Sequence, residues 1–244
     1  MGLINRLRYI FRTGDGPVVT ISIIALTVVI WLAQIITANA VTIALVFQPY
    51  YAIFEPWRYL TSAFLHSTSP LFGDIPIPTP LHIGMNMYVL YVIGPVLEYH
   101  MGRLKFIALY LLSALGGNIA VSLYACFIDS ALWGVPSLGA SGAIFGLFTA
   151  MIMLQKRLGL DLKGIMMTLL INVAIPFILP GIAWQAHIGG GIIGLVLGYA
   201  YYFLPNRFMD VDRKKVHVIS IVAVFVLLIA LALIPPFVNP YGVL

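Results

Sequence analysis

Charged residues are scarce in this chain of 244 residues: they make up 9% of it, whereas hydrophobic residues make up 61%. An average soluble domain carries about 25% charged residues. The chain therefore has too few charges to cover a globular surface in water, which excludes a soluble enzyme, a disordered protein and a nucleic-acid binder. The composition and the length predict a polytopic membrane protein with one domain.

Cysteine is also nearly absent. The single Cys126 excludes an intrachain disulfide framework and any CxxC metal site. The sequence shows no internal repeat, no low-complexity tract and no separate soluble domain. A transporter, which commonly carries repeats and ionisable residues at mid-membrane, is therefore disfavoured.

Long apolar segments are abundant instead. A membrane-spanning helix needs about 20 largely apolar residues. Seven segments fit or approach this length, which predicts an all-α, polytopic bundle of membrane helices. They cover residues 17–38, 81–98, 105–127, 141–155, 164–180, 182–204 and 215–234.

The basic residues predict how these spans are oriented. Twelve of the 13 lysines and arginines fall in alternate connections, and Arg58 is the exception. Short cytoplasmic connections carry an excess of Lys and Arg. We therefore expect a multi-pass protein of the cell membrane with its N-terminus in the cytoplasm and its C-terminus outside. The twelve residues are Arg6, Arg8, Arg12, Arg103, Lys105, Lys156, Arg157, Lys163, Arg207, Arg213, Lys214 and Lys215.

Polar residues mark the outer ends of three spans that run inward. The second span begins with His82 and Asn86, the fourth with Ser141, and the sixth with His187. Ser141 precedes Lys156 by roughly 22 Å of helix, at about 1.5 Å per residue, whereas the hydrocarbon core is about 30 Å thick. The serine is therefore expected below the outer boundary, where polar residues are rare and usually functional.

These residue types predict nucleophilic catalysis. A serine nucleophile needs a base, and His187 is the plausible one. Because no Asp or Glu lies in the outer halves of the spans, a Ser–His dyad is favoured over a triad, with Phe145 stacked on the imidazole one helical turn after Ser141. The side chains of His82 and Asn86, at i and i+4, and the backbone amide of Ser141 are expected to stabilise an oxyanion.

Glycines predict how the fourth and sixth spans meet. Gly190 and Gly194 repeat at a spacing of four after the histidine, and Gly142 and Gly146 form a similar stripe after the serine. Small residues let membrane helices approach closely. We therefore expect the serine hydroxyl within about 5 Å of an imidazole nitrogen, with Gly139 and Gly142 permitting the tight backbone around the nucleophile.

Simpler interpretations compete with this one. A serine between glycine and alanine is commonly a packing residue, and only the matched depth of three polar sites favours chemistry. His82 and His187 are zinc-ligand types, but zinc needs three or four ligands and no HExxH motif is present. We expect no metal and no cofactor, and we expect His66 to be a capping or interface residue.

In order along the chain, these motifs resemble the rhomboid family of intramembrane serine proteases. The resemblance implies Ser141 as nucleophile, His187 as general base, and His82, Asn86 and the Ser141 amide as the oxyanion hole. It also implies that Trp57 and Arg58 form the family's structural dipeptide. The matching motifs are Glu55-Pro56-Trp57-Arg58, His82-xxx-Asn86, Glu98-xxx-Gly102-Arg103, Gly139-Ala140-Ser141-Gly142 and Ala186-His187-xx-Gly190-xxx-Gly194.

Two features depart from the family pattern. The segment Ser67–Pro80 is longer than in many members, and Phe145 stands where a tyrosine is common. The seventh span makes the chain similar to the members with six helices plus one. The resemblance thus implies a cytoplasmic tail (1–16), a six-helix catalytic core (17–204) with a long outer segment (39–80), and a C-terminal part (205–244) with an inner loop, the seventh helix and an outer tail.

The function expected from the residues and the resemblance is that of an intramembrane serine endopeptidase. Its partners would be transmembrane protein substrates and the lipid bilayer, and it would cut near the outer leaflet. The alternative is a non-catalytic rhomboid-like membrane protein that binds client transmembrane helices, although such a protein would not need the dyad. The sequence predicts no oligomeric state.

Overall fold

The computed structural model describes residues 16–68, 79–178, 181–207 and 211–238, and within these ranges the regular structure is helical. The only β-type pairing among the described residues is an isolated antiparallel bridge between Phe47 and Ser137. The prediction of an all-α polytopic bundle is confirmed. The long helices are α2 (Val18–Ile36), α6 (Thr79–Met101), α7 (Arg103–Phe127), α8 (Ser141–Leu158), α9 (Lys163–Ile178), α10 (Trp184–Tyr202) and α11 (Arg213–Ala232).

Each of the seven predicted spans coincides with one long helix. Five segments of the described chain are long and apolar enough to cross a membrane. The other two predicted spans form α8, most of whose side chains are buried in the bundle, and α9, which is apolar but has only 16 residues. The five segments are Val18–Ile36, Pro80–Met101, Arg103–Phe127, Trp184–Asn206 and Arg213–Val238.

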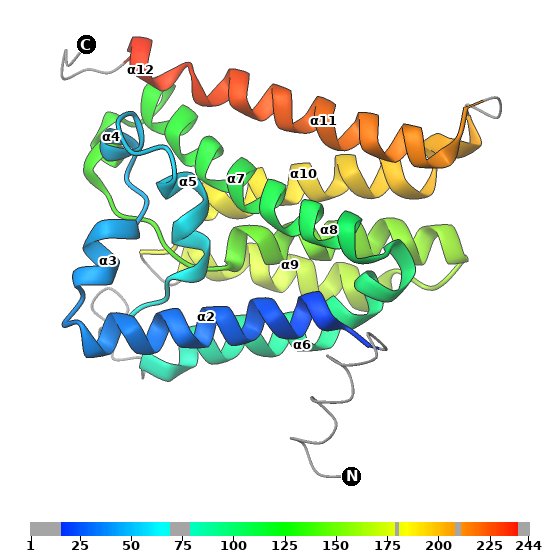
Figure 1. Cartoon of the computed structure of the whole chain (residues 1–244), viewed down its shortest axis with the longest axis horizontal. Helices are drawn as coiled ribbons and strands as arrows, with labels where there is room; N and C mark the ends of the chain where they lie inside the picture. The colour runs from blue at the N-terminus through cyan, green and yellow to red at the C-terminus, as the bar shows by residue number, and fades with distance from the viewer. Residues whose placement is uncertain (1–15, 69–78, 179–180, 208–210, 239–244) are drawn as a thin grey trace.

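The long helices lie roughly side by side along the longest axis of the molecule (Figure 1). Helices α7, α8 and α10 pack most extensively on one another and form the centre of the bundle. Helix α2 packs mainly on α6, whereas α11 packs on α7 and α10 and leaves most of its apolar side chains exposed. The predicted site residues of α8 and α10 therefore belong to the best-packed part of the fold.

Glycines allow the backbones of α8 and α10 to touch. A Cβ atom added to Gly190 would overlap the carbonyl oxygen of Gly142, and one added to Gly194 would overlap that of Gly146. Any side chain at Gly190 or Gly194 would therefore force the two helices apart. Close backbone approach of this kind is typical of helix contacts in membranes.

Helix α6 continues three residues past residue 98, the approximate predicted end of the second span, to Met101. Glu98 is a charged residue that ends the apolar run in the sequence, but it is buried at 4% exposure. Its carboxylate accepts hydrogen bonds from the backbone N–H of Val19 (2.9 Å) and of Thr20 (2.8 Å) and from the Thr20 hydroxyl (2.8 Å). It thus satisfies N–H groups at the start of α2, which have no acceptor within their own helix.

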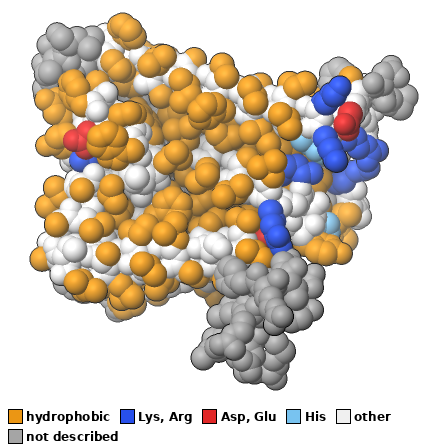
Figure 2. Space-filling model, in the orientation of Figure 1, with side chains coloured by type: hydrophobic (Ala, Val, Ile, Leu, Met, Phe, Trp, Pro, Cys, Tyr) orange, Lys and Arg blue, Asp and Glu red, His pale blue; other side chains and the backbone are white. Residues whose placement is uncertain are grey.

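Basic side chains gather at one end of the molecule, around the connection between α10 and α11 and its neighbours (Figure 2). The described members of the predicted cytoplasmic set lie at or near the helix ends that meet where α6 joins α7, α8 joins α9 and α10 joins α11. Arg6, Arg8 and Arg12 of the N-terminal tail lie outside the described residues, as do 69–78 of the long outer link and 239–244 of the C-terminal tail. Ser141 lies at the N-terminal end of α8 and His187 at the N-terminal end of α10, far from the basic end of the molecule.

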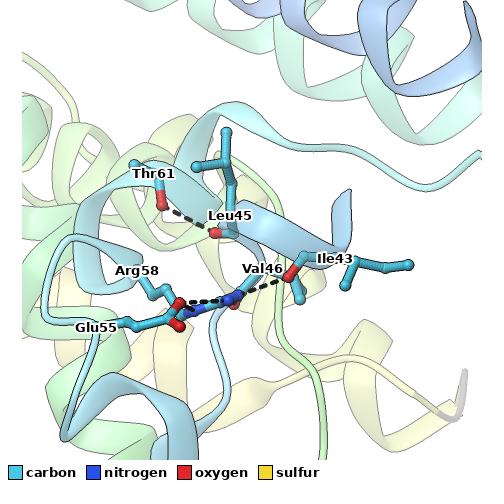
Figure 3. A network of polar contacts seen from close by, with 6 residues as sticks. All are labelled: Ile43, Leu45, Val46, Glu55, Arg58 and Thr61. Carbon is cyan, nitrogen blue, oxygen red and sulfur yellow. Dashed lines mark hydrogen bonds and ion pairs between the residues drawn. The ribbon is translucent and has the colours of Figure 1, made fainter. Parts of the chain in front are cut away.

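The outer segment contains the short helices α3 (Ala40–Leu45), α4 (Pro49–Ala52) and α5 (Arg58–Thr61), followed by the 3-10 turn η1 (Ser62–Phe64). Arg58, which is 6% exposed, holds it together. One terminal nitrogen of its guanidinium, Nη1, donates to the carbonyl oxygens of Ile43 and Val46, both at 2.8 Å, and the group pairs with Glu55 (Figure 3). Trp57, by contrast, is half exposed.

Candidate active site

Ser141 is the first residue of α8, and His187 lies in the first turn of α10. Both helices begin at the same end of the bundle and touch through their glycines, so the two side chains meet. The hydroxyl oxygen of Ser141 lies 2.9 Å from Nε2 of His187. This distance lies well within the limit of about 5 Å expected from the sequence, and it is within catalytic hydrogen-bonding range.

The imidazole of His187 is held by packing. Phe145, one turn after Ser141 on α8, stacks on it with ring centroids 4.1 Å apart and planes inclined by 10°. The other ring nitrogen, Nδ1, is buried and has no hydrogen-bond partner among the described residues. In the described part of the chain the arrangement is therefore a serine–histidine pair with an aromatic support and no carboxylate behind the imidazole.

His82 and Asn86 lie one turn apart on α6 and line the same cavity as the pair. The ring of His82 lies against the backbone of Gly139: a Cβ there would be 3.2 Å from its Nε2 and Cε1 and 3.9 Å from the Ser141 hydroxyl. Gly139 has a φ of +124°, which disfavours any residue with a side chain. The amide nitrogen of Asn86 donates to the carbonyl oxygen of His82 at 2.8 Å, which leaves its second hydrogen for another acceptor.

The backbone amide of Ser141 belongs to the first turn of α8. The first N–H groups of a helix have no acceptor within it, and the helix dipole favours negative charge there. The amide and the side chains of α6 thus border the cavity beside the serine hydroxyl. Together they make a setting suited to a developing oxyanion.

The cavity has a volume of about 780 Å³ and extends from these polar groups between α6, α8 and α9. Most of its remaining wall is apolar. Among the wall residues are Met85 and Val89 of α6, Phe148 of α8, and Ile175 and Ile178 of α9. Residue 180, the predicted end of the fifth span, lies outside the described residues.

The expectation for His66 was wrong. Its side chain is fully buried and borders the cavity, with its ring centroid 5.0 Å from that of His82. Its backbone N–H donates to the side-chain oxygen of Gln34, whose amide donates back to the His66 carbonyl, both at 3.0 Å. Burial lowers the pKa of His66 from its ordinary 6.5 to about 3, so the ring is neutral at pH 7.

No metal cluster accompanies these histidines within the described ranges, where no three His, Cys, Asp or Glu side chains are arranged to hold an ion.

Trp57 and Arg58 do not reach the serine–histidine pair. Arg58 makes its hydrogen bonds within the outer segment, and Trp57 is half exposed at the surface of that segment. The structure therefore gathers Ser141, His187 and Phe145 on one side of the cavity and the α6 residues on the other.

Comparison with known proteins gives a consistent picture. A Rhomboid domain matches residues 54–204. RHOMBOID-like protein 5 of Arabidopsis thaliana is 33% identical over 159 residues, covering 62% of this chain and 46% of that protein. Rhomboid protease AarA of Providencia stuartii is 27% identical over 174 residues (62% and 58%), and Rhomboid protease GluP of Bacillus subtilis (strain 168) is 31% identical over 157 residues (62% and 27%).

The aligned part covers less than two thirds of each of these relatives. The matched domain nevertheless covers more than half of the present chain and contains Ser141, His187, His82 and Asn86, which line the cavity. Together with the long apolar helices, it indicates a multi-pass membrane protein. The chain belongs to the rhomboid family.

Proposed function

We propose that this protein is an intramembrane serine endopeptidase that cleaves transmembrane protein substrates near the outer leaflet. The contact of 2.9 Å between the Ser141 hydroxyl and His187 Nε2 carries the proposal, because it pairs a nucleophile with a base. Two relatives named as rhomboid proteases support the general class of activity.

In the proposed reaction, neutral His187 accepts the hydroxyl proton as the oxygen of Ser141 attacks the peptide carbonyl carbon. The resulting oxyanion receives hydrogen bonds from the Ser141 amide and from the side chains of His82 and Asn86. His187 then gives its proton to the leaving amine, and water hydrolyses the acyl-enzyme by the same route. The stacked ring of Phe145 keeps the imidazole in the plane that these transfers need.

The proposed substrate class rests on the predicted depth of Ser141 in the membrane and on the mostly apolar wall of the cavity. A substrate helix hides its carbonyl groups in its own hydrogen bonds, so it must unwind locally before one reaches the serine. Glycine and proline lower helix stability, by about 1 and 3 kcal/mol per residue relative to alanine. We therefore propose substrates whose helices are weakened by Gly or Pro near the outer boundary, entering a cavity whose walls include α6 and α9.

The proposed orientation places the basic end of the molecule in the cytoplasm of a cell and the serine–histidine end toward the outside. In this arrangement the N-terminus is cytoplasmic and the C-terminus lies outside. Residues 17–204 form the catalytic core, and the part from residue 205 onward adds the seventh helix.

The test is cleavage of a single-span reporter in liposomes by the wild-type protein and by Ser141→Ala, with the cut site mapped by mass spectrometry. We expect a single cluster of cuts near the outer boundary and no cleavage by the variant. Full activity in Ser141→Ala would exclude this serine as the nucleophile. A poly-Leu span that is cut as fast as a Gly/Ala-rich one would contradict the proposed substrate class.

A fluorophosphonate probe distinguishes catalysis from the non-catalytic alternative. It should label Ser141 in the wild type and fail to label the His187→Ala variant, because the hydroxyl then lacks its base. A protein that binds the reporter helix but neither cuts it nor reacts with the probe would be a client-binding member of the family instead.

A further inference from the structure

Asn118 of α7 is a buried polar residue, 7% exposed, that the chemistry above does not use. Its amide nitrogen donates to the carbonyl oxygen of Tyr59 and to the hydroxyl oxygen of Ser62, both at 2.8 Å. A backbone carbonyl can only accept, so the amide must present its NH₂ group on this side. Both of its hydrogens are thereby directed to the outer segment, at the junction of α5 and η1.

Ser62 in turn contacts the loop that leads into α8. Its carbonyl oxygen accepts the N–H of Gly139 at 3.0 Å, two residues before Ser141. Gly139 is also the residue whose backbone lies against the ring of His82. The chain of contacts therefore runs from the centre of the bundle through Asn118 and Ser62 to Gly139, which lies beside both the His82 ring and the Ser141 hydroxyl.

The rest of this loop is held farther from the serine. Ser137 exchanges backbone hydrogen bonds with Phe47 (2.8 and 3.2 Å), and the Gln48 amide donates to the carbonyl of Gly134 at 2.7 Å. The bond from Gly139 to Ser62 is thus the last tie before α8 begins. It lies two residues before Ser141, the first residue of α8.

We propose that Asn118 is a positioning residue for the reaction: acting through Ser62, it fixes the backbone at Gly139 and thereby the placement of the Ser141 amide opposite His82. The inference rests on the proposed function for its kinetic consequence. Without the amide, two buried acceptors lose their donor, and η1 loses its anchor to α7. A shift on the order of 1 Å in catalytic geometry costs roughly 100-fold in rate.

The experiment compares Asn118→Ala and Ser62→Ala with Ser122→Ala in the liposome reporter assay. Ser122 is the matched control, because its hydroxyl bonds the Tyr59 hydroxyl at 3.1 Å and so also joins α7 to α5 without reaching Ser62 or Gly139. We expect Asn118→Ala to lower kcat by about 10- to 100-fold with KM unchanged. Ser122→Ala should stay close to wild type, at similar thermal stability.

A double variant tests whether the effect passes through Ser62. If it does, Asn118→Ala with Ser62→Ala should lower kcat no more than Asn118→Ala alone, since residues in one network are not additive. Independent multiplication of the two losses would overturn the proposal. So would a raised KM at unchanged kcat, because that result would place Asn118 in direct contact with substrate.

Backbone hydrogen exchange provides a readout that does not depend on activity. Peptides covering residues 134–140 should exchange faster in Asn118→Ala and in Ser62→Ala than in wild type or Ser122→Ala. If the wild type cleaves no reporter, the proposed function fails, and the exchange result still decides whether Asn118 fixes the backbone at Gly139 through Ser62. Unchanged exchange in both Asn118→Ala and Ser62→Ala would overturn the proposal. Ser62→Ala serves as the milder substitution if Asn118→Ala does not fold.

Discussion

Replacing Gly190 with alanine tests whether backbone contact between α8 and α10 sets the distance from serine to histidine. The added methyl carbon would overlap the carbonyl oxygen of Gly142, the residue after Ser141. Neither partner is a flexible side chain, so the helices themselves must separate. Since His187 lies one turn before Gly190 on the same helix, the imidazole must move with it.

Two opposing effects determine the size of the response. Alanine is a better helix former than glycine by about 0.8–1.0 kcal/mol, whereas overpacking a filled contact typically costs about 1–3 kcal/mol. We therefore expect a modest net loss of stability. The rate should fall much more, by roughly 100-fold for a displacement on the order of 1 Å.

Gly191→Ala is the matched control on the same helix. A Cβ at Gly191 would meet only the methyl group of Thr149, at 3.6 Å, which is an ordinary contact. This variant should keep its activity and gain slightly in thermal stability. The assays are reporter kcat, the rate of fluorophosphonate labelling at Ser141, and Tm in detergent. Equal activity in the Gly190 and Gly191 variants would refute the idea that this contact sets the catalytic distance.

Two further predictions concern buried polar groups. Glu98→Gln should lower the free energy of unfolding by about 1.5–3 kcal/mol, the range for hydrogen bonds to charged groups. Replacing its half-exposed partner Arg103 with Gln should change Tm little. Equal Tm shifts in the two variants would contradict the role of Glu98 as the acceptor for the first N–H groups of α2. Because the pKa of His66 is lowered to about 3 by burial, stability should be complete above pH 6.5 and decline as the pH falls toward 3. His66→Gln should flatten this decline in Tm measured from pH 7 to 4, and an unchanged slope would show that another group causes it.

The sequence predicts the helices well because hydropathy and helix length carry the information. The seven apolar segments coincide with seven helices, with ends displaced by a few residues. Helix α6 extends past the predicted residue 98 because Glu98 is a charged residue buried inside the fold. Its partners are backbone groups of α2, far away in sequence, and such a partnership leaves no local signal.

The site itself divides in the same way. Ser141, His187, Asn86 and His82 are recognisable because polar residues at matched depth interrupt apolar spans. Asn118 is equally visible as an interruption of α7, but its contacts depend on how the outer segment folds over the bundle. The hydrogen-bond partners of such a side chain depend on the tertiary packing of irregular backbone, so its residue type and spacing in the sequence do not identify them.

The packing of the bundle explains how the two proposed catalytic groups, Ser141 and His187, are aligned with no carboxylate behind the imidazole in the described part of the chain. In lipid, helices gain little from burying apolar surface against one another, so close van der Waals contact determines their separation. Between α8 and α10 that contact is made by backbone atoms, which have no rotamers to relax. Ser141 and His187 each lie within one turn before a glycine of this contact, Gly142 and Gly190, so the contact restricts their backbone positions as well. Two features are not determined by this contact. The rotation of the imidazole is restricted by the stacked ring of Phe145, and the position of the Ser141 amide is controlled by the hydrogen bond between Gly139 and Ser62.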